Sequence, residues 1–206
     1  MYLLVPIIGY IFGCINGSQI IGKYKNINIK QSGMKNAGAS NTTILLGWKY
    51  GAVVAFIDVF KAVISLMITA LILNNYNILY EWQMILLYIN ALFVVIGHNF
   101  PLTMNFNGGK GTASFFGVLA YFDWKFAVLG LFILLLFAVV TNYFVMGTFM
   151  LYVSFITYTA YTYGRETVYI AFFFKLLFIL KHMENFKRIL NKEEVKISSL
   201  LRREVS

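Results

Sequence analysis

Cysteine, proline and charge are all scarce in this chain of 206 residues. Cys14 is the one cysteine, which excludes a scaffold of intrachain disulfides. Charged residues make up 12% of the sequence and hydrophobic residues 60%, which excludes a disordered binding segment. A soluble domain of this size has too little interior for so much apolar surface, so the composition predicts a polytopic membrane protein.

Acidic residues are also few, with 8 against 17 lysines and arginines, and the net charge is +9. A nucleic-acid partner would suit such a chain, because phosphate-binding surfaces are basic. The basic residues, however, collect in residues 23–49 and 181–203 and are nearly absent between the other apolar runs. This distribution is typical of a membrane orientation signal, so we expect no nucleic-acid partner.

Long apolar runs dominate what the sequence does contain. A hydrocarbon core of about 30 Å takes about 20 helical residues to cross. We therefore expect an all-α integral membrane protein with about seven transmembrane helices in one domain, residues 1–206. The expected spans are Tyr2–Gly22, Gly51–Leu73, Trp82–Gly97, Ala113–Phe122, Lys125–Val140, Tyr143–Tyr161 and Val168–Leu180. The first is interpreted as a retained span, because it lacks the basic start of a cleaved signal peptide.

An odd number of spans places the two termini on opposite sides of the membrane. With a cytoplasmic C-terminus, thirteen of the 17 basic residues share the cytoplasmic side, and only Lys125 and Arg165 face outward. Lys61 and Lys175 fall inside spans. The positive-inside rule therefore predicts an outside N-terminus and a cytoplasmic C-terminus.

Three polar segments interrupt the apolar pattern, all on the predicted cytoplasmic face. The first, Ser32–Thr43, is rich in small, hydroxyl and amide residues. Turns of this composition let backbone N–H groups converge on an anion. A flexible loop of turn-forming residues is the alternative interpretation.

The second polar segment, Gly97–Thr112, contains a lysine set among glycines, Gly108-Gly109-Lys110-Gly111. At the start of a helix this pattern places N–H donors, a positive dipole end and an ammonium around one point, which suits a phosphate. The spacing matches neither a Walker loop nor a Rossmann fingerprint, which disfavours a nucleotide. For Lys110 alone, a lysine that snorkels to the membrane interface is the alternative.

The third polar segment, His182–Glu194, follows the last expected span. On a helix His182 and Asn185 share a face, with Arg188 one turn further on. This geometry allows the three side chains to form part of a functional site. The segment can also be interpreted as an amphipathic juxtamembrane helix that its basic residues bind to anionic lipid, and the two interpretations are compatible.

A charged pair falls inside the second expected span, where Asp58 and Lys61 are spaced i,i+3. Ionisable residues at membrane depth are costly and indicate function, although a purely structural pair is equally consistent with the pattern. The sequence shows no cluster of cysteine, histidine and carboxylate residues typical of a metal site.

The three segments together resemble the motifs of the PlsY family of integral membrane acyl-phosphate:glycerol-3-phosphate 1-O-acyltransferases. The second segment, GHNFPLTMNFNGGKGTASFFG, is similar to the family signature GHxFP…GGKG. The third, HMENFKRILNKEE, is similar to HRxNIxRLxxGxE with Glu194 in register, and Asp58 and Lys61 match a DxxKG element. In the first segment the residues that match GSGNxGATN are Gly33, Asn36, Gly38, Ala39, Ser40 and Asn41.

The resemblance implies transfer of an acyl group from acyl phosphate to the 1-hydroxyl of glycerol 3-phosphate, giving lysophosphatidic acid and phosphate. It implies His182 and Asn185 as catalytic residues, and Asp58, Lys61 and Glu194 as structural ones. The substrate- and phosphate-binding residues expected from it are Gly33, Asn36, Gly38, Ser40, Asn41, His98, Gly108, Gly109, Lys110, Gly111 and Arg188.

The same resemblance implies a multi-pass protein of the cell membrane with its active site on the cytoplasmic face. The expected partners are acyl phosphate, glycerol 3-phosphate, the lipid bilayer and an enzyme that produces acyl phosphate. No metal or cofactor is expected, because an acyl phosphate is already activated. The His-x4-Asp pattern of other glycerolipid acyltransferases is absent after both histidines.

Four of the departures from the family pattern affect positions where it has a serine, a glycine and two arginines. Met34 and Lys35 replace its serine and glycine, Ile44 replaces an arginine, and Asn142 replaces the arginine between the fifth and sixth spans. A thioether cannot donate the hydrogen bond of a hydroxyl, and a lysine does not reproduce an arginine fork. The alternative function is therefore a catalytically weakened paralogue that binds acyl phosphate or another anionic lipid precursor, and a transporter is a third hypothesis.

Overall fold

The computed structural model describes residues 2–76 and 78–199, and every regular element within these ranges is a helix. The chain divides into two compact units, Met1–Phe122 and Asp123–Ser206, which we call unit 1 and unit 2. The helices of unit 1 are α1 (Leu4–Cys14), α2 (Gly17–Tyr24), α3 (Ala39–Leu46), α4 (Trp48–Asn74), α5 (Tyr80–Asn99), the 3₁₀ helix η1 (Leu102–Met104) and α6 (Thr112–Phe122). Those of unit 2 are α7 (Trp124–Thr141), α8 (Phe144–Thr162) and α9 (Arg165–Leu190).

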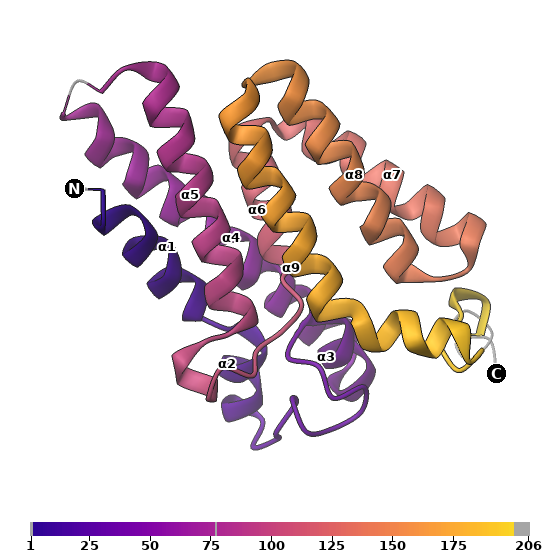
Figure 1. Cartoon of the computed structure of the whole chain (residues 1–206). Helices are drawn as coiled ribbons and strands as arrows, with labels where there is room; N and C mark the ends of the chain where they lie inside the picture. The colour runs from indigo at the N-terminus through magenta and orange to yellow at the C-terminus, as the bar shows by residue number, and fades with distance from the viewer. Residues whose placement is uncertain (1, 77, 200–206) are drawn as a thin grey trace. The chain divides into compact units, whose positions relative to one another are not determined.

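In unit 1 the N-terminal helix α1 lies along α5, and α4 packs against α1, α5 and α6 (Figure 1). The α1–α5 contact is close because glycines face each other. A Cβ atom on Gly13 would lie 2.8 Å from the Gly97 Cα and would also meet the Val94 carbonyl. Small residues at helix contacts let backbones approach in this way, as is common in membrane helices.

The first expected span is interrupted in the structure. Helix α1 ends at Cys14, Ile15 is extended with a ψ of 109°, and α2 starts at Gly17. The Asn16 side chain caps α2 by accepting a hydrogen bond from the Gln19 N–H at 3.1 Å. A break in a membrane helix is tolerated only where the freed backbone groups find partners inside the protein, and these partners belong to the site described below.

In unit 2 the apolar helix α7 packs along α8, and α8 packs along α9 (Figure 1). Asp123 caps α7, because its carboxylate accepts hydrogen bonds from the N–H groups of Lys125 and Phe126. Burial opposes ionisation of Asp123, but the hydrogen bonds from the Tyr158 hydroxyl and these N–H groups outweigh it and lower the pKa of the carboxyl.

Five segments in the described ranges are long and apolar enough to cross a membrane: Leu4–Tyr24, Trp48–Asn74, Tyr80–Met104, Trp124–Thr141 and Phe144–Thr162. They correspond to five of the expected spans. The expected fourth span is the short helix α6, with 11 residues. The seventh is part of α9, which runs on through the third polar segment. The all-helical prediction agrees with the structure, whereas the count of seven and the orientation stay predictions.

Candidate functional site

The first polar segment is an ordered loop built around one asparagine. Asn41 is fully buried, and its amide nitrogen donates to the carbonyls of Ile29, Ser32 and Asn36 at 2.7–3.0 Å. Its amide oxygen accepts from the Met34 N–H at 2.8 Å. Asn41 thus joins four residues of the loop, and the segment from Ala39 onward forms helix α3 and not loop.

Two loop positions take up the left-handed conformation, Gly33 with a φ of 58° and Lys35 with a φ of 51°. Gly33 also needs its lack of a Cβ, since that atom would lie 2.6 Å from the Asn41 amide oxygen. Lys35 replaces a glycine of the family pattern, so the backbone keeps the glycine-like conformation although a lysine must adopt it.

The glycines of the second segment lie against the end of α5. The Gly108 and Gly109 N–H groups donate to the carbonyls of Asn99 and His98, at 3.2 and 3.1 Å. Gly111 has a φ of 84° and directly precedes α6. A Cβ on Gly111 would lie 2.7 Å from the Asn99 amide oxygen, so the loop requires glycine for both conformation and space.

The charge of Lys110 and its position in the chain are suited to binding an anion. It is half-buried between the buried Gly109 and Gly111, immediately before the first turn of α6. The first N–H groups of a helix lack carbonyl partners in the helix and carry a partial positive charge, which adds to that of the ammonium.

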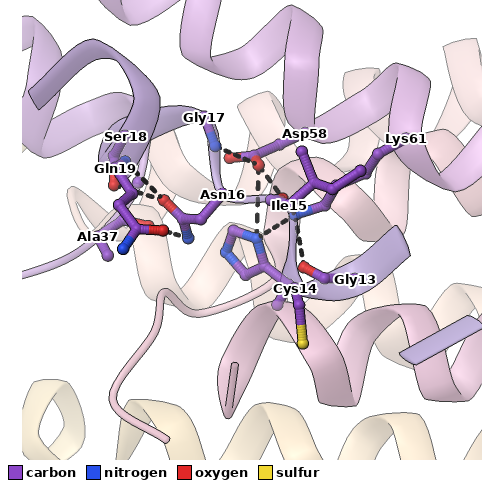
Figure 2. A network of polar contacts seen from close by, with 12 residues as sticks. Gly13, Cys14, Ile15, Asn16, Gly17, Ser18, Gln19, Ala37, Asp58 and Lys61 are labelled. Carbon is purple, nitrogen blue, oxygen red and sulfur yellow. Dashed lines mark hydrogen bonds and ion pairs between the residues drawn. The ribbon is translucent and has the colours of Figure 1, made fainter. Parts of the chain in front are cut away.

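A buried cluster of charge lies directly beneath these loops. The Lys61 ammonium donates to Asp58 Oδ1 at 3.0 Å and to the carbonyls of Gly13 and Ile15 at 3.1 and 2.6 Å (Figure 2). It also lies 2.8 Å from His98 Nδ1. The predicted i,i+3 pair is thus formed, and it also supplies partners for carbonyls that the break after α1 leaves free.

Asn16 and Gly17 connect this cluster to the first loop, and sequence reasoning missed both. The Gly17 N–H donates to Asp58 Oδ1 at 3.2 Å, and the Asn16 amide nitrogen donates to the Ala37 carbonyl at 3.5 Å (Figure 2). Ser18 donates to the Asn16 amide oxygen at 2.7 Å. A run of Asn, Gly and Ser inside an apolar span was the signal that could have indicated them.

The first and second segments meet within unit 1. Lys30 Nζ donates to the Gly108 carbonyl at 3.4 Å. A Cβ on Gly109 would fall against both His98 Nε2 and the Ala37 carbonyl. Residues far apart in sequence therefore form one polar region of unit 1, in which the predicted residues Gly33, Asn36, Gly38, Asn41, His98, Gly108, Gly109 and Gly111 lie; Ser40 is exposed on α3.

The third segment lies in unit 2, on the last turns of α9. His182 is buried, its Nδ1 lies 2.9 Å from the Phe178 carbonyl, and its ring packs on the Phe178 ring. Glu194 accepts from the Asn185 amide and from Arg188 Nε, both at 2.6 Å. Glu194 thus holds two predicted site residues in place, which suits the structural role expected of it.

The chain after α9 folds back on unit 2. Lys192, which falls on the glycine of the family ending HRxNIxRLxxGxE, has a φ of 60° and allows this turn. Asn142 has a φ of 64°, and its amide group accepts from the Ser198 N–H and donates to the Ser198 hydroxyl, each at 2.9 Å. At the position of a family arginine, Asn142 therefore holds the segment after α9.

The described residues contain no group of three or more His, Cys, Asp or Glu side chains that could hold a metal ion. Unit 1 instead offers backbone N–H groups, glycines and a lysine, and unit 2 offers a histidine, an amide and a guanidinium. With its apolar helices, the chain is thereby defined as a polytopic membrane protein with glycine-lined polar loops.

Comparison with known proteins narrows this class. The profile of the family described as glycerol-3-phosphate acyltransferase matches residues 3–192. Glycerol-3-phosphate acyltransferase 1 of Oceanobacillus iheyensis is 51% identical over 205 residues, which cover 100% of this chain and 99% of that protein. Glycerol-3-phosphate acyltransferase of Thermoanaerobacter sp. (strain X514) is 34% identical over 197 residues, 95% of each chain.

A solved structure agrees with these relatives. The crystal structure of PlsY (YgiH), an integral membrane glycerol 3-phosphate acyltransferase, in its glycerol 3-phosphate form matches with a TM-score of 0.84. The identity is 27%, and the match covers 97% of this chain and 96% of that one. The chain belongs to the glycerol-3-phosphate acyltransferase family, and the resemblance to PlsY is confirmed.

Proposed function

We propose that the protein transfers an acyl group from acyl phosphate to the 1-hydroxyl of glycerol 3-phosphate. Membership of the family supports the acceptor, since relatives are named for glycerol 3-phosphate and the matching PlsY structures are of the glycerol 3-phosphate and lysophosphatidic acid forms. The observation that supports the proposal most directly in this chain is the loop Gly108–Gly111. Its glycine backbone and Lys110 directly precede the first residue of helix α6, and the loop lies next to the buried cluster of Asp58, Lys61 and His98.

The reaction needs a nucleophile, a leaving group and a path for one proton. The substrate hydroxyl oxygen attacks the acyl carbon, the bond from that carbon to the phosphate oxygen breaks, and phosphate leaves with the electron pair. The hydroxyl proton passes to a phosphate oxygen, so acid–base help from the protein is secondary. His182 and Asn185 assist this transfer by hydrogen bonding and take no proton from the substrate.

Binding of phosphate groups is the main task of the remaining residues. Lys110 and the glycine backbone bind one phosphate by charge-assisted hydrogen bonds. Gly33, Asn36, Gly38, Ser40 and Asn41 bind or shape the binding surface for the substrates, and Arg188 adds a guanidinium. Asn41 acts through the loop, because its amide group already bonds four backbone groups of residues 29–36.

The test is an assay of the purified protein with acyl phosphate and glycerol 3-phosphate. We expect lysophosphatidic acid and phosphate in equal amounts. An acyl thioester in place of acyl phosphate is the matched control for the donor, and product from the thioester alone would overturn the proposed donor. An absence of product with either donor would overturn the acyltransferase activity.

The location is proposed from the same charge asymmetry that predicts the orientation. We place the polar loops of both units on the cytoplasmic side of the cell membrane. Single cysteines at Lys35, Lys110 and Lys192, in a Cys14→Ala background, should react with an impermeant thiol reagent only from that side. Labelling of any one from outside would overturn the orientation.

A weakened enzyme is the second candidate, supported by the exposure of two departures from the family pattern. Met34 and Ile44 are 44% and 51% exposed, so apolar side chains cover surface where the family has a hydroxyl and a guanidinium. For this candidate, Met34→Ser combined with Ile44→Arg should raise phosphate release about tenfold. A brisk wild type that is slowed by the double substitution would exclude it.

A further inference from the structure

Asp58, Lys61 and His98 form a buried cluster in unit 1, and His98 contacts the glycine loop. All three side chains are at most 3% exposed. Asp58 Oδ1 accepts from Lys61 Nζ at 3.0 Å and from the Gly17 N–H at 3.2 Å. His98 Nδ1 is further away, 3.5 Å from the same oxygen.

The charge of the cluster follows from its burial. An isolated charge in this environment is expensive, whereas an ionised Asp58 and an ionised Lys61 cancel at 3.0 Å. Protonation of His98 would add an uncompensated positive charge to the same place. A neutral Lys61 would leave the Asp58 carboxylate without a countercharge. The balanced state is therefore Asp58⁻, Lys61⁺ and neutral His98.

The tautomer of His98 follows from the contact with Lys61. An ammonium carries three donors and no acceptor. Here four atoms share those three donors: Asp58 Oδ1, the carbonyl oxygens of Gly13 and Ile15, and His98 Nδ1. The separation of 2.8 Å from Nδ1 is attractive only if that nitrogen presents its lone pair. The proton of the neutral imidazole is then on Nε2.

The protonated edge faces the substrate-binding loops. A single methyl group on Gly109 would touch both His98 Nε2 and the Ala37 carbonyl, so the Nε2 edge, the glycine loop and the first polar loop meet at one point. The histidine backbone contributes as well, because its carbonyl accepts from the Gly109 N–H at 3.1 Å.

We infer that Asp58 and Lys61 are positioning residues that hold His98 as the neutral Nε2–H tautomer, so that His98 gives a hydrogen-bond donor, and not a base, to the junction of the two loops. The inference depends on the proposed function only for its effect on turnover. It assigns the charged pair a role beyond helix packing, since the pair selects which imidazole nitrogen carries the proton.

Histidine NMR tests the tautomer directly, because the chain contains 2 histidines. The sample is the full chain in lipid bilayers with ¹⁵N-labelled histidine. The substitution His182→Gln removes the other histidine, so all histidine side-chain signals then come from His98. We expect an unprotonated Nδ1 and a protonated Nε2. A protonated Nδ1, alone or together with a protonated Nε2, would overturn the inference. This measurement needs no substitution of Asp58, Lys61 or His98.

Variants of the pair give a second readout. In Lys61→Met the ammonium is lost and Asp58 is the remaining partner of Nδ1, so we expect the proton to move to Nδ1. In Asp58→Asn the Lys61 charge loses its countercharge, which favours the neutral amine. An amine can accept from Nδ1–H, so the Nδ1-protonated form should become detectable. An unchanged Nε2–H signal in a folded Lys61→Met protein would show that the pair does not select the tautomer.

Turnover should follow the tautomer. Loss of a correctly placed donor typically lowers kcat by about 10²–10³-fold, and we expect this range for Lys61→Met with a much smaller change in KM. Ser65→Ala is the matched control, because Ser65 lies on the same helix as Lys61, α4. The substitution removes a buried hydrogen bond from Ser65 to Asn90 of α5 and leaves the contacts of His98 in place. It should change neither the tautomer nor kcat.

The two proposals can fail separately. An active wild type with a proton on Nδ1 overturns this inference and leaves the proposed function standing. A protein without activity whose His98 carries its proton on Nε2 overturns the proposed function and supports the tautomer assignment. His98→Gln keeps an N–H donor and should retain about tenfold more activity than His98→Leu; equal activity would contradict the donor role.

Discussion

The two ion pairs that organise the polar regions of units 1 and 2 differ in their access to water. Asp58 and Lys61 are 1% and 2% exposed, whereas Glu194 and Arg188 are 13% and 40% exposed. A buried pair has been removed from water at high cost and is costly to break. In a partly exposed pair such as Glu194 with Arg188, water can replace a lost partner at lower cost. The comparison predicts that breaking the pair in unit 1 costs more stability than breaking the pair in unit 2.

Asp58→Asn should have the largest effect on stability. The substitution keeps the shape of the side chain and leaves the Lys61 charge buried without compensation. We expect a loss of about 3–5 kcal/mol in the free energy of unfolding, measured by denaturant titration in mixed micelles. A loss below about 1 kcal/mol, the range of an exposed pair, would break the comparison.

Lys110→Ala should act on binding and not on stability. The half-buried ammonium is proposed to bind a phosphate, and a hydrogen bond to a charged group contributes about 1.5–3 kcal/mol. The apparent affinity for the phosphate substrates should fall by the corresponding factor in the acyl transfer assay. Lys49→Ala removes an exposed lysine of the same unit and is the control. Unchanged affinity in Lys110→Ala would return Lys110 to an interfacial role.

Glu194→Gln is the counterpart of Asp58→Asn at the exposed pair. Glutamine can still accept one hydrogen bond from Asn185 or Arg188, and water reaches the guanidinium. We expect a loss of about 1 kcal/mol in the free energy of unfolding. A double-mutant cycle with Arg188→Met measures the pair itself, and a coupling as large as that of Asp58 with Lys61 would show that exposure does not distinguish the pairs.

The smallest expected effect concerns two lysines in left-handed conformations, one in each unit. Lys35 and Lys192 have φ values of 51° and 60°, where a Cβ costs about 1–2 kcal/mol. Glycine removes that strain but loses more entropy on folding, by about 0.5–1 kcal/mol. Lys35→Gly and Lys192→Gly should each stabilise the protein by about 0.5 kcal/mol, and a destabilisation of either would mean that the lysine side chain contributes contacts of its own.

The local features of the sequence were predictable because their causes are local. The second to sixth apolar runs predicted helices whose ends lie within a few residues of those observed, as for Trp82–Gly97 against Tyr80–Asn99. The first expected span is interrupted after Cys14, and the seventh, Val168–Leu180, belongs to a helix that continues to Leu190. The i,i+3 spacing of Asp58 and Lys61 predicted an ion pair, because helix geometry places these positions on one face. The motifs also sufficed to indicate the family, since residue identity at a spacing needs no coordinates.

Features that depend on contacts across the chain were not predictable. The break after Cys14 was missed, because the carbonyls that it frees depend on a partner far away in sequence. The helix α3 and the bonding of Asn41 were also missed, although the partners of Asn41 lie only 5 to 12 residues away. The Lys61 ammonium donates hydrogen bonds to the carbonyls of Gly13 and Ile15, which are 48 and 46 residues away in sequence. No periodicity carries that information.

Apolar run length and motif spacing are enough to identify a helical membrane protein of the glycerol-3-phosphate acyltransferase family, because both are properties of a single chain segment. The contacts of His98, with one nitrogen near Gly109 and the other near Lys61, follow only from the packing of the helices. The physical reason is that a hydrogen bond depends on the distance and direction between two atoms. For residues on different helices, packing alone sets that geometry.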